Sequence, residues 1–514
     1  MAVTDFIAAI ELGSTRIAGV AGRRSSNGNI QILAYASEKS SDCIRKGTIF
    51  NIDKTAQLVS VVLGKLEDMM KASICKVYVG VGGQSVRSIR NSESKKLTED
   101  TRISQALIDD MMKSNKELPL IDKEILSVEP QEYKIGNNQL TTEPVGIATD
   151  RIEGHFLNII GRTSLRSNIR QCFRLASGGN DIAECVLAPD ALAQVVLTPS
   201  EKRSGCVLVD MGADTTTVLI YRNNILRHLA VIPLGGNNIT KDICSQQMVE
   251  EDAEQIKLSY GSAYTEASDN KEDSGRELSI DGRTTIRANK LEDIIEARVE
   301  EILQNVLNQI VLSDYSDKLL AGAVLTGGAA NMLNMEDAFT RITKIEKVRT
   351  ARDTAVELEG YANLIPMDGT HNTLIGILAA GKENCCKQEK SNKRPEIDLQ
   401  DIMSQKQEEE KRLQELAAEE ARKEAEARRK EKEKREKKKR DCEALIVAAN
   451  SHKERREYKA ALQKAKAALA VGIEDKTEEI ETLIAEINRL KDENNPLKKF
   501  FRKLSDSADE IMKE

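Results

Sequence analysis

Two short segments, about 200 residues apart, combine an acidic residue, a glycine and hydroxyl side chains between two apolar runs. The first segment follows the apolar run of residues 6–10 and contains Glu11, Gly13, Ser14 and Thr15. A strand, a tight glycine turn and a returning strand form a β-hairpin, and the backbone N–H groups at its tip can cradle phosphate oxygens. Taken alone, this first segment is typical of an ordinary hairpin.

The second segment repeats the pattern more distinctly. A buried strand ends at Asp210, Gly212 and Thr215 follow, and another strand leads to Gly235 and Gly236. The repetition predicts a duplicated fold whose two halves face each other across a nucleotide. Glu11 and Asp210 would then approach a phosphate-bound Mg²⁺ through water, because this hard cation prefers octahedral oxygen ligands.

Two further segments follow in the chain. Glu254 and Lys257 are three residues apart, so on a helix they share a face and, taken alone, predict a surface ion pair. Thr326, Gly327 and Gly328 end a buried strand, and paired glycines let a backbone pass close to a flat ring or a ribose. Each segment alone is weak evidence for a binding site, but the four in this order form a specific pattern.

In this order the segments resemble those of the actin, sugar-kinase and chaperone ATPase superfamily, and within it the bacterial FtsA family, over roughly residues 5–385. The resemblance implies an α/β fold: actin-like, duplicated ribonuclease-H-type lobes around a nucleotide cleft, an inserted small α+β subdomain and an α-helical C-terminal tail. It implies ATP and Mg²⁺ as cofactors, with Glu11 and Asp210 on the metal side. The implied nucleotide contacts are Gly13, Ser14, Thr15, Arg16, Gly212, Asp214, Thr215, Gly235, Gly236, Glu254, Lys257, Thr326, Gly327 and Gly328.

Some residues depart from the family pattern. Glu11 stands where Asp is usual, Arg16 where Lys is common, and Asp214 interrupts a glycine run. The Asp214 carboxylate would repel phosphates unless it is turned away or bound to a metal. Ala188 aligns with a water-positioning Glu or Gln, and Asp190 is two positions away. We therefore expect ATP binding with slow or negligible hydrolysis.

The expected domains follow from these segments and from changes in composition. Residues 77–85 resemble the point where the FtsA family inserts its own subdomain. The expected parts are a first lobe at 1–83 and 163–204, the inserted subdomain at 84–162, a second lobe at 205–385 with a smaller subdomain at about 245–318, a charged helical linker at 386–441, a helical hairpin at 442–495 and an amphipathic membrane-targeting helix at 496–514.

Composition excludes several classes of protein. The chain has 514 residues, 76 Lys and Arg against 83 Asp and Glu, and a net charge of −7, which argues against nucleic acid as its main partner. Its nine cysteines are scattered and its histidines number four, which argues against a disulfide framework or a zinc site. It has no apolar run of about 20 residues and no basic leader. We therefore expect that it does not cross a membrane and that it stays in the compartment where it is made.

The last quarter of the chain differs from the rest in its composition. Between Arg422 and Arg440 only Ala425 and Ala427 are uncharged, which favours a solvated helix over a core segment. Residues 441–491 regain a helical period; their spacing faintly resembles a tetratricopeptide unit, but a plain helical hairpin is the simpler prediction.

After Pro496 an apolar stripe is flanked by cations, which fits insertion into an anionic lipid interface. Docking onto the protein's own tail or onto a partner groove is the alternative. The expected membrane-binding residues are Leu497, Lys498, Phe500, Phe501, Arg502 and Leu504.

Three functions can be weighed. The first, implied by the FtsA resemblance, is an adaptor that anchors the FtsZ ring to the cytoplasmic face of the membrane at the division septum. Its partners would be FtsZ, copies of itself in actin-like polymers, anionic lipids and later division proteins. The second is a sugar-type kinase, which needs a catalytic Asp that the cleft segments do not clearly supply. The third, a chaperone, would need a β-sandwich module, and residues 386–514 are predicted to be helical instead.

Overall fold

The computed structural model describes residues 5–494, apart from residues 26, 99–100, 137, 177–179, 266–275, 281–284, 362–363 and 387–435. The chain divides into two compact units, Met1–Glu389 and Lys390–Glu514. The expected membrane-binding residues 497–504 and most of the expected charged linker lie outside the described residues.

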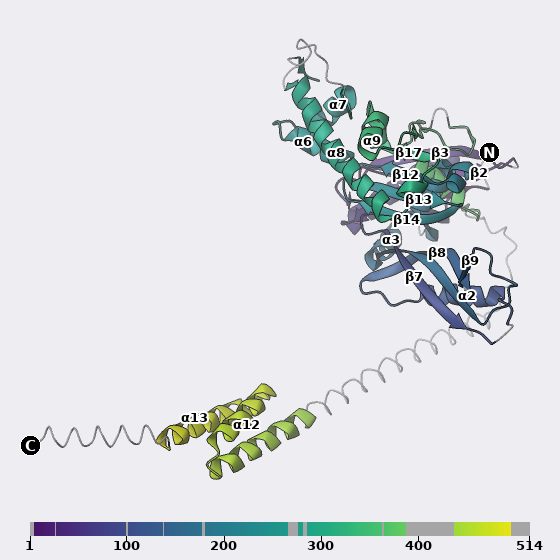
Figure 1. The fold of residues 1–514 in the computed structure, drawn as a ribbon. Coiled ribbons are helices and arrows are strands. Elements are labelled where there is room, and N and C mark those ends of the chain that lie inside the picture. The colour runs from purple at the N-terminus through teal and green to yellow at the C-terminus, as the bar shows by residue number, and fades with distance from the viewer. Residues whose placement is uncertain are drawn as a thin grey trace, which may run out of the picture. The chain divides into compact units, whose positions relative to one another are not determined.

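Groups of strands and helices follow one another along the first unit (Figure 1). The strands are β1 (Ile7–Leu12), β2 (Arg16–Arg24), β3 (Ile30–Lys39), β4 (Ile44–Arg45), β5 (Thr48–Ile49), β6 (Lys76–Val81), β7 (Arg87–Lys96), β8 (Lys123–Ile135), β9 (Gln139–Thr141), β10 (Arg151–Arg162), β11 (Asp181–Leu187), β12 (Cys206–Met211), β13 (Thr216–Arg222), β14 (Ile225–Ile232), β15 (Glu277–Leu278), β16 (Ile286–Arg287), β17 (Gly322–Thr326), β18 (Val348–Thr350) and β19 (Leu358–Glu359). The helices are α1 (Ile52–Met70), α2 (Gln105–Lys116), α3 (Thr163–Leu175), α4 (Ala188–Val196), α5 (Pro199–Ser204), α6 (Gly236–Cys244), α7 (Glu250–Tyr260), α8 (Ala288–Leu312), α9 (Met335–Thr343) and α10 (Asn372–Ala380).

Two sheets repeat one arrangement of strands. In the first sheet, β1, β2 and β3 form an antiparallel meander, and β6 and β11 continue it in parallel beyond β1. In the second sheet, β12, β13 and β14 form the same meander, and β17 and β18 continue it in parallel beyond β12. The duplication predicted from the two hairpin motifs is therefore present in the strand order itself.

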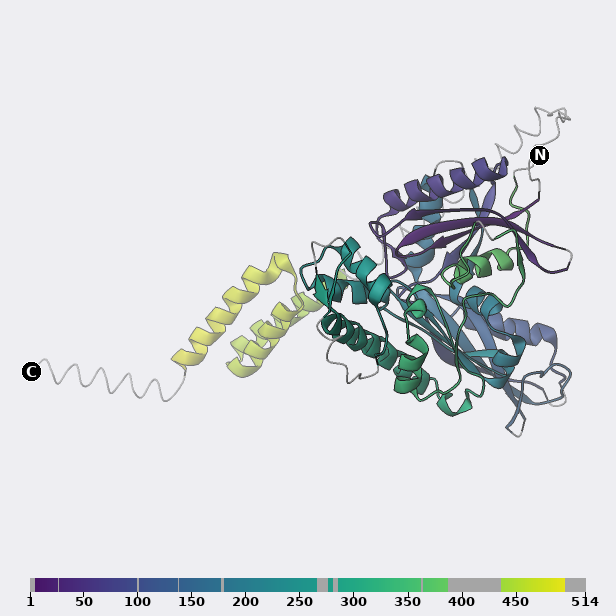
Figure 2. The ribbon, with the colours of Figure 1, turned by 90° about the horizontal axis from the view of Figure 1, so that it is seen from above.

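The two lobes share one large apolar core, which contains Ile10 and Leu208, and the second lobe has another of its own. The first strand, IAAIEL, is almost wholly buried at its centre, and α1 packs on β2 and β3. Figure 2 shows α1, in purple, lying over the first sheet. In the second lobe, α8 packs against α6, α9 and β13 through buried residues from Leu291 to Ile310. Strands buried on both faces need such helical cover, which explains their nearly continuous apolar sequences.

The inserted subdomain extends the second sheet, although its chain leaves from the first lobe. Its strands β7, β10, β8 and β9 follow β14 in the sheet order, and Ala230 of β14 pairs with Arg87 of β7. A salt bridge of 2.6 Å joins Arg227 of β14 to Glu132 of β8, and the Arg227 side chain is only 3% exposed. The insertion therefore connects the two lobes physically.

The N-cap of α1 provides a modest test of this fold. The side chain of Asn51 accepts a hydrogen bond of 3.1 Å from the Lys54 backbone N–H, satisfying a donor that has no partner within the helix. We expect Asn51→Ala to lower the free energy of unfolding by about 1 kcal/mol, as measured by urea denaturation. Gln57→Ala on the exposed face of α1 is the control, and an equal loss in both variants would contradict the capping role.

The second unit contains three described α-helices: residues 436–454, α12 (Tyr458–Ala470) and α13 (Thr477–Glu493). Their core is small and rich in alanine, with Ala461, Ala465 and Ile487 fully buried. Residues 436–441, expected as the end of a charged helical linker, are helical and run directly into the following helix, because neither Gly nor Pro interrupts this stretch. Within the described residues, no helix combines the length and apolar character that crossing a membrane requires.

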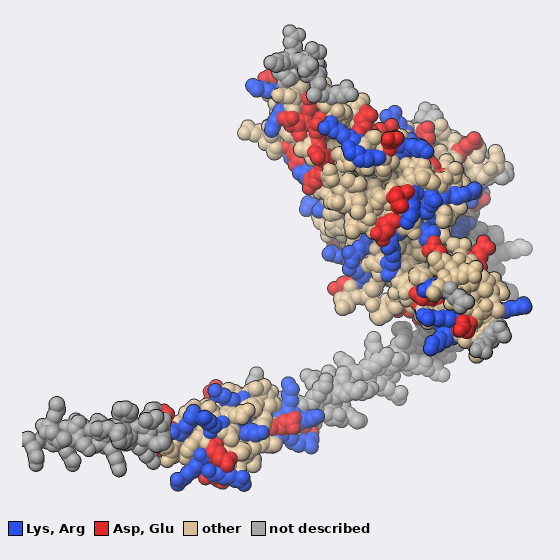
Figure 3. Space-filling model, viewed as in Figure 1, with Lys and Arg blue, Asp and Glu red and all other residues tan. Residues whose placement is uncertain are grey.

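Charged side chains of both signs are interspersed over the face in Figure 3, without a broad basic surface. All nine cysteines lie within the described residues, and none forms a disulfide.

Candidate active site: a cleft between two hairpin tips

The tip between β1 and β2 is closed by one backbone hydrogen bond, from the Gly13 N–H to the Arg16 carbonyl at 3.0 Å. A Cβ at Gly13 would lie 2.8 Å from that carbonyl oxygen, so the turn requires glycine. The Ser40 hydroxyl donates to the Gly13 carbonyl and fixes the tip from outside. Glu11 lies on the strand two residues before the turn.

The tip between β12 and β13 has the same construction. The Gly212 N–H donates to the Thr215 carbonyl at 2.9 Å, and Asp210 lies two residues before Gly212, as Glu11 lies before Gly13. Gly235 packs on this tip: a Cβ there would lie 2.5 Å from the Gly212 carbonyl oxygen. The two segments are therefore alike in their backbone hydrogen bonds as well as in their residue types.

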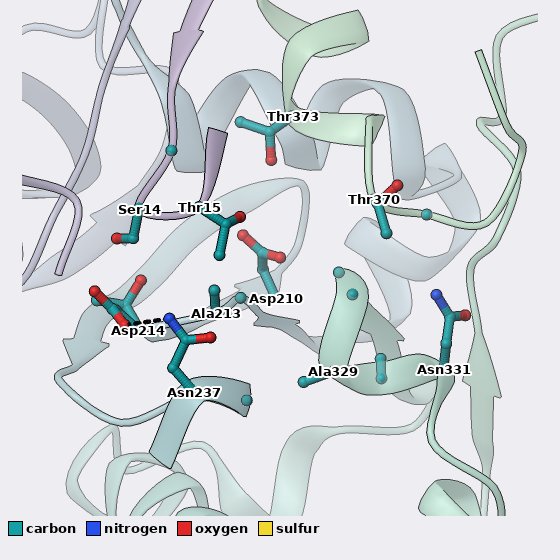
Figure 4. A pocket seen from close by; sticks show the side chains of 18 of the residues that line it. Ser14, Thr15, Asp210, Ala213, Asp214, Asn237, Ala329, Asn331, Thr370 and Thr373 are labelled. Atoms are coloured by element: carbon teal, nitrogen blue, oxygen red, sulfur yellow. Dashed lines mark hydrogen bonds between the residues drawn. The ribbon is translucent and has the colours of Figure 1, made fainter. Parts of the chain in front are cut away.

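Both tips line one cavity of about 1230 Å³. Thr15 and Asp210 come from different tips, and Figure 4 shows both side chains directed into this space. The residues expected from the sequence that line the cavity are Glu11, Gly13, Ser14, Thr15, Arg16, Asp210, Gly212, Asp214, Thr215, Gly236, Glu254, Lys257, Gly327 and Gly328.

Gly235 and Thr326 are expected site residues that do not line the cavity. Gly235 supports the second tip from behind, as described above. Thr326 is 1% exposed; its hydroxyl donates to the Ala351 carbonyl and accepts from the Asn372 side chain, both at 3.1 Å. Both residues therefore support the site without facing it.

Glu11 and Asp210 have strongly shifted pKa values. Burial raises the pKa of both carboxyl groups to about 7; Arg16 opposes the shift at Glu11, and Asp210 adds to it. Neither carboxylate forms a hydrogen bond or a salt bridge with a residue that the structure describes. Two such carboxylates facing one cavity fit a divalent cation, which would hold them ionised. Among the described residues no cluster of three or more His, Cys, Asp or Glu could hold a metal, so water and phosphate would have to complete its ligand shell.

Glu254 and Lys257 do form an ion pair, of 2.6 Å, in which the glutamate side chain is 39% exposed and the lysine is buried. The Lys257 side chain is 8% exposed, and its ammonium group also donates to the Thr240 hydroxyl and the Gly236 carbonyl. A lysine with three acceptors at a cavity wall is fixed in position. The helix spacing predicted the pair, but only the packing of α7 on α6 buries its lysine.

The comparisons with known proteins agree with this architecture. A family model described as "Cell division protein FtsA" matches residues 207–365, and a model of the SHS2 domain inserted in FtsA matches residues 83–160. "Cell division protein FtsA" from Neisseria meningitidis is 30% identical over 399 residues, covering 76% of this chain and 92% of the relative. The chain belongs to the FtsA family. The protein of the same name from Enterococcus faecalis is 31% identical and covers 66% of this chain and 76% of its own length.

Among solved structures, the PilM–PilN type IV pilus biogenesis complex matches with a TM-score of 0.51 and 13% identity, covering 72% of this chain and 97% of the matched one. At that identity the match shows the fold alone. The actin-like α/β fold and the FtsA resemblance inferred from the sequence are both confirmed.

The structure shows where two departures from the FtsA family pattern lie, at Ala188 and at Asp214. Ala188 lines the cavity, whereas Asp190 does not; the Asp190 carboxylate accepts a hydrogen bond of 2.9 Å from the Tyr221 hydroxyl. Asp190 is therefore engaged elsewhere and does not replace a water-positioning residue. Asp214, by contrast, faces the cavity with both oxygens bonded, to the Lys46 N–H and to the Asn237 side chain.

Sequence reasoning missed several parts of the cleft, among them the loop before α10. Asp368, Gly369 and Thr370 line the cavity, and the Thr370 carbonyl accepts a hydrogen bond of 2.8 Å from Arg16. The Asp368 carboxylate in turn accepts from the Thr370 N–H. The signal was present, since Asp-Gly-Thr combines an acid, a glycine and a hydroxyl as both tips do, but no strand pair flanks it.

Proposed function

We propose that this FtsA-family protein binds ATP with Mg²⁺ in the cleft between its lobes. The observation that carries the proposal is the facing pair of hairpin tips, each with a glycine turn and, two residues before it, a half-buried carboxylate that no described residue pairs. Backbone N–H groups of the tips would hold the phosphates, and the Glu11 and Asp210 carboxylates would face the metal through water. Mg²⁺ would neutralise the phosphate charge.

The adenosine would lie toward α7 and the loop after β17. There Lys257 and Glu254 are fixed by their mutual ion pair, and Gly327 and Gly328 present backbone without side chains. Gly327 has φ +88°, and a Cβ there would lie 2.5 Å from an Asp210 carboxylate oxygen. Glycine at this position therefore keeps the metal-side carboxylate and the adenosine loop in contact.

We propose further that hydrolysis is slow or absent, because Ala188 offers no group to orient a water molecule and Asp190 is bonded to Tyr221. Calorimetric titration of the full chain with Mg²⁺ and ATP tests the binding, and single-turnover measurement of phosphate release tests the rate. Saturable one-to-one binding with turnover far below 1 s⁻¹ is the expected result. Absence of binding would refute the proposed nucleotide site. Turnover of several per second would refute the proposed slow hydrolysis.

The proposed cellular role is to anchor the FtsZ ring to the cytoplasmic face of the membrane at the septum, with later division proteins as further partners. Family membership supports this role, together with the sequence of residues 497–504, which lie outside the described residues. The FtsZ contact is proposed for the smaller subdomain of the second lobe, at about 245–318, and actin-like self-association for the lobes.

Liposome binding tests the membrane part of this role. We expect the double substitution Phe500→Asp and Phe501→Asp to reduce co-sedimentation with anionic liposomes at least tenfold, because carboxylates replace the two rings that would enter the lipid interface. The matched control is Asp506→Asn with Asp509→Asn, which removes charge from the same segment and should preserve binding or strengthen it. Equal sedimentation of the wild type and the Phe variant would exclude this segment as the anchor.

A further inference from the structure

A short turn of the first lobe lies against both hairpin tips. It joins β4 and β5 through Lys46 (φ +50°) and Gly47 (φ +67°), the conformation of a type I′ hairpin turn. Its position is fixed from behind, since the Gln84 N–H donates to the Lys46 carbonyl and a Cβ at Gly47 would lie 2.7 Å from the Cα of Gly83.

The two N–H groups of this turn point at the two tips. The Gly47 N–H donates to the Ser14 hydroxyl at 3.0 Å, and the Lys46 N–H donates to one Asp214 carboxylate oxygen at 2.9 Å. Ser14 belongs to the first lobe and Asp214 to the second, so the second bond crosses the cleft. Backbone N–H groups of a turn can bind anionic oxygens, and here the Lys46 N–H is bound to a carboxylate and the Gly47 N–H to a hydroxyl.

Asp214 is held from its own lobe as well. The Asn237 side chain, on the first turn of α6, donates to the other carboxylate oxygen at 2.8 Å, as Figure 4 shows. The Asn237 N–H also donates to the Ala213 carbonyl at 2.7 Å, which fixes the apex of the tip. The negative charge of Asp214 is therefore fixed at the cleft, at the tip where phosphates are proposed to bind.

We propose that Asp214 determines how this cleft discriminates between nucleoside triphosphate and diphosphate. Its carboxylate competes with the terminal phosphate for the Lys46 N–H and repels that phosphate, whereas a diphosphate leaves the bond across the cleft intact. Two like charges about 5 Å apart at an effective dielectric constant of about 20 correspond to more than a tenfold difference in affinity. Asp214 is thus a specificity residue for the nucleotide, and the inference rests on the function proposed above.

The test compares the dissociation constants of ATP and ADP, each with Mg²⁺, for the full chain and its variants. We expect Asp214→Asn, which removes the charge with little change of shape, to tighten ATP binding relative to ADP at least tenfold. The matched control is Asp337→Asn, which removes one exposed carboxylate from the wall of the same cavity and should change the ratio less than twofold. Asp214→Ser is the second neutral variant, should Asp214→Asn fail to fold.

Hydrogen exchange gives a second measurement that does not depend on affinity. Without nucleotide, the Lys46 amide should exchange more slowly in the wild type than in Asp214→Ser, and in the wild type ATP should perturb this amide more than ADP does. An unchanged ATP-to-ADP ratio in the neutral variants overturns the inference and leaves the proposed function standing. Failure of the wild type to bind either nucleotide overturns the proposed function and the inference with it.

Discussion

Asp210→Asn is expected to abolish Mg²⁺-dependent nucleotide binding while making the nucleotide-free protein more stable at pH 8. Burial raises the pKa of this carboxyl group from 3.8 to about 7, so the folded state resists its ionisation. The unfolded chain releases the proton near its ordinary pKa, and the resulting loss of stability grows as pH rises from about 4 and is complete above 7. The amide removes this loss and also removes the charge that would face the metal.

The size of the gain can be bounded. The carboxylate lines the cavity and is only half-buried, so we expect only about 1–3 kcal/mol at pH 8, less than the pKa difference alone would imply. Thermal denaturation without nucleotide at pH 5 and pH 8, with calorimetric titration of Mg²⁺ and ATP, provides the measurement. The gain should be smaller at pH 5. Asp353→Asn, an exposed carboxylate outside the cavity, is the control; the proposed role fails if Asp210→Asn retains wild-type binding.

Arg227→Met is expected to loosen the inserted subdomain from the second lobe and to cost about 3 kcal/mol of stability. The Arg227 guanidinium is bonded to Glu132 at 2.6 Å and to the Gln131 side chain at 3.1 Å, and it lies over the Tyr315 ring. The Arg227 side chain is buried and that of Glu132 is one-third exposed, so removing the arginine loses its buried contacts and leaves a half-buried carboxylate without its partner, which is costly. Urea denaturation and hydrogen exchange of β7 and β10 give the measurement.

Arg90→Met is the matched control, because Arg90 joins the same subdomain to the same lobe through an exposed pair with Asp314. Exposed pairs contribute little, so we expect a loss below about 1 kcal/mol. Similar losses in the two variants, or unchanged exchange in β7 and β10, would show that the buried pair does not attach the subdomain.

Much of the fold was predictable because it depends on local sequence patterns. Apolar runs that end at glycine turns, such as residues 6–13 and 205–212, predicted the hairpins, and their repetition predicted the duplicated lobes. The expected start of the insertion at residue 84 lies close to β7, which begins at Arg87. What no local pattern indicated is that β7 pairs with β14, more than 130 residues later in the chain. Such a pairing depends on the edge that the second lobe leaves open.

The candidate site divides in the same way. Gly13, Gly212 and Gly235 were expected there from the resemblance to the FtsA family, and Gly13 and Gly212 are in the glycine turns themselves. Gly235, though, proved to support a tip from behind. Lys46 and Gly47 escaped notice because their contribution is a pair of backbone N–H groups, which any sequence carries.

The sequence by itself determined the family, the duplicated lobes and the residue types at each tip, since turn geometry and strand burial are imposed by neighbouring residues. Only the tertiary structure decided the electrostatics. The Lys257 side chain is buried because α7 packs on α6. The Asp214 carboxylate forms a hydrogen bond across the cleft because a turn of the other lobe lies within reach. Burial and long-range partners set the charge of an ionisable group, and both depend on residues far away in the chain.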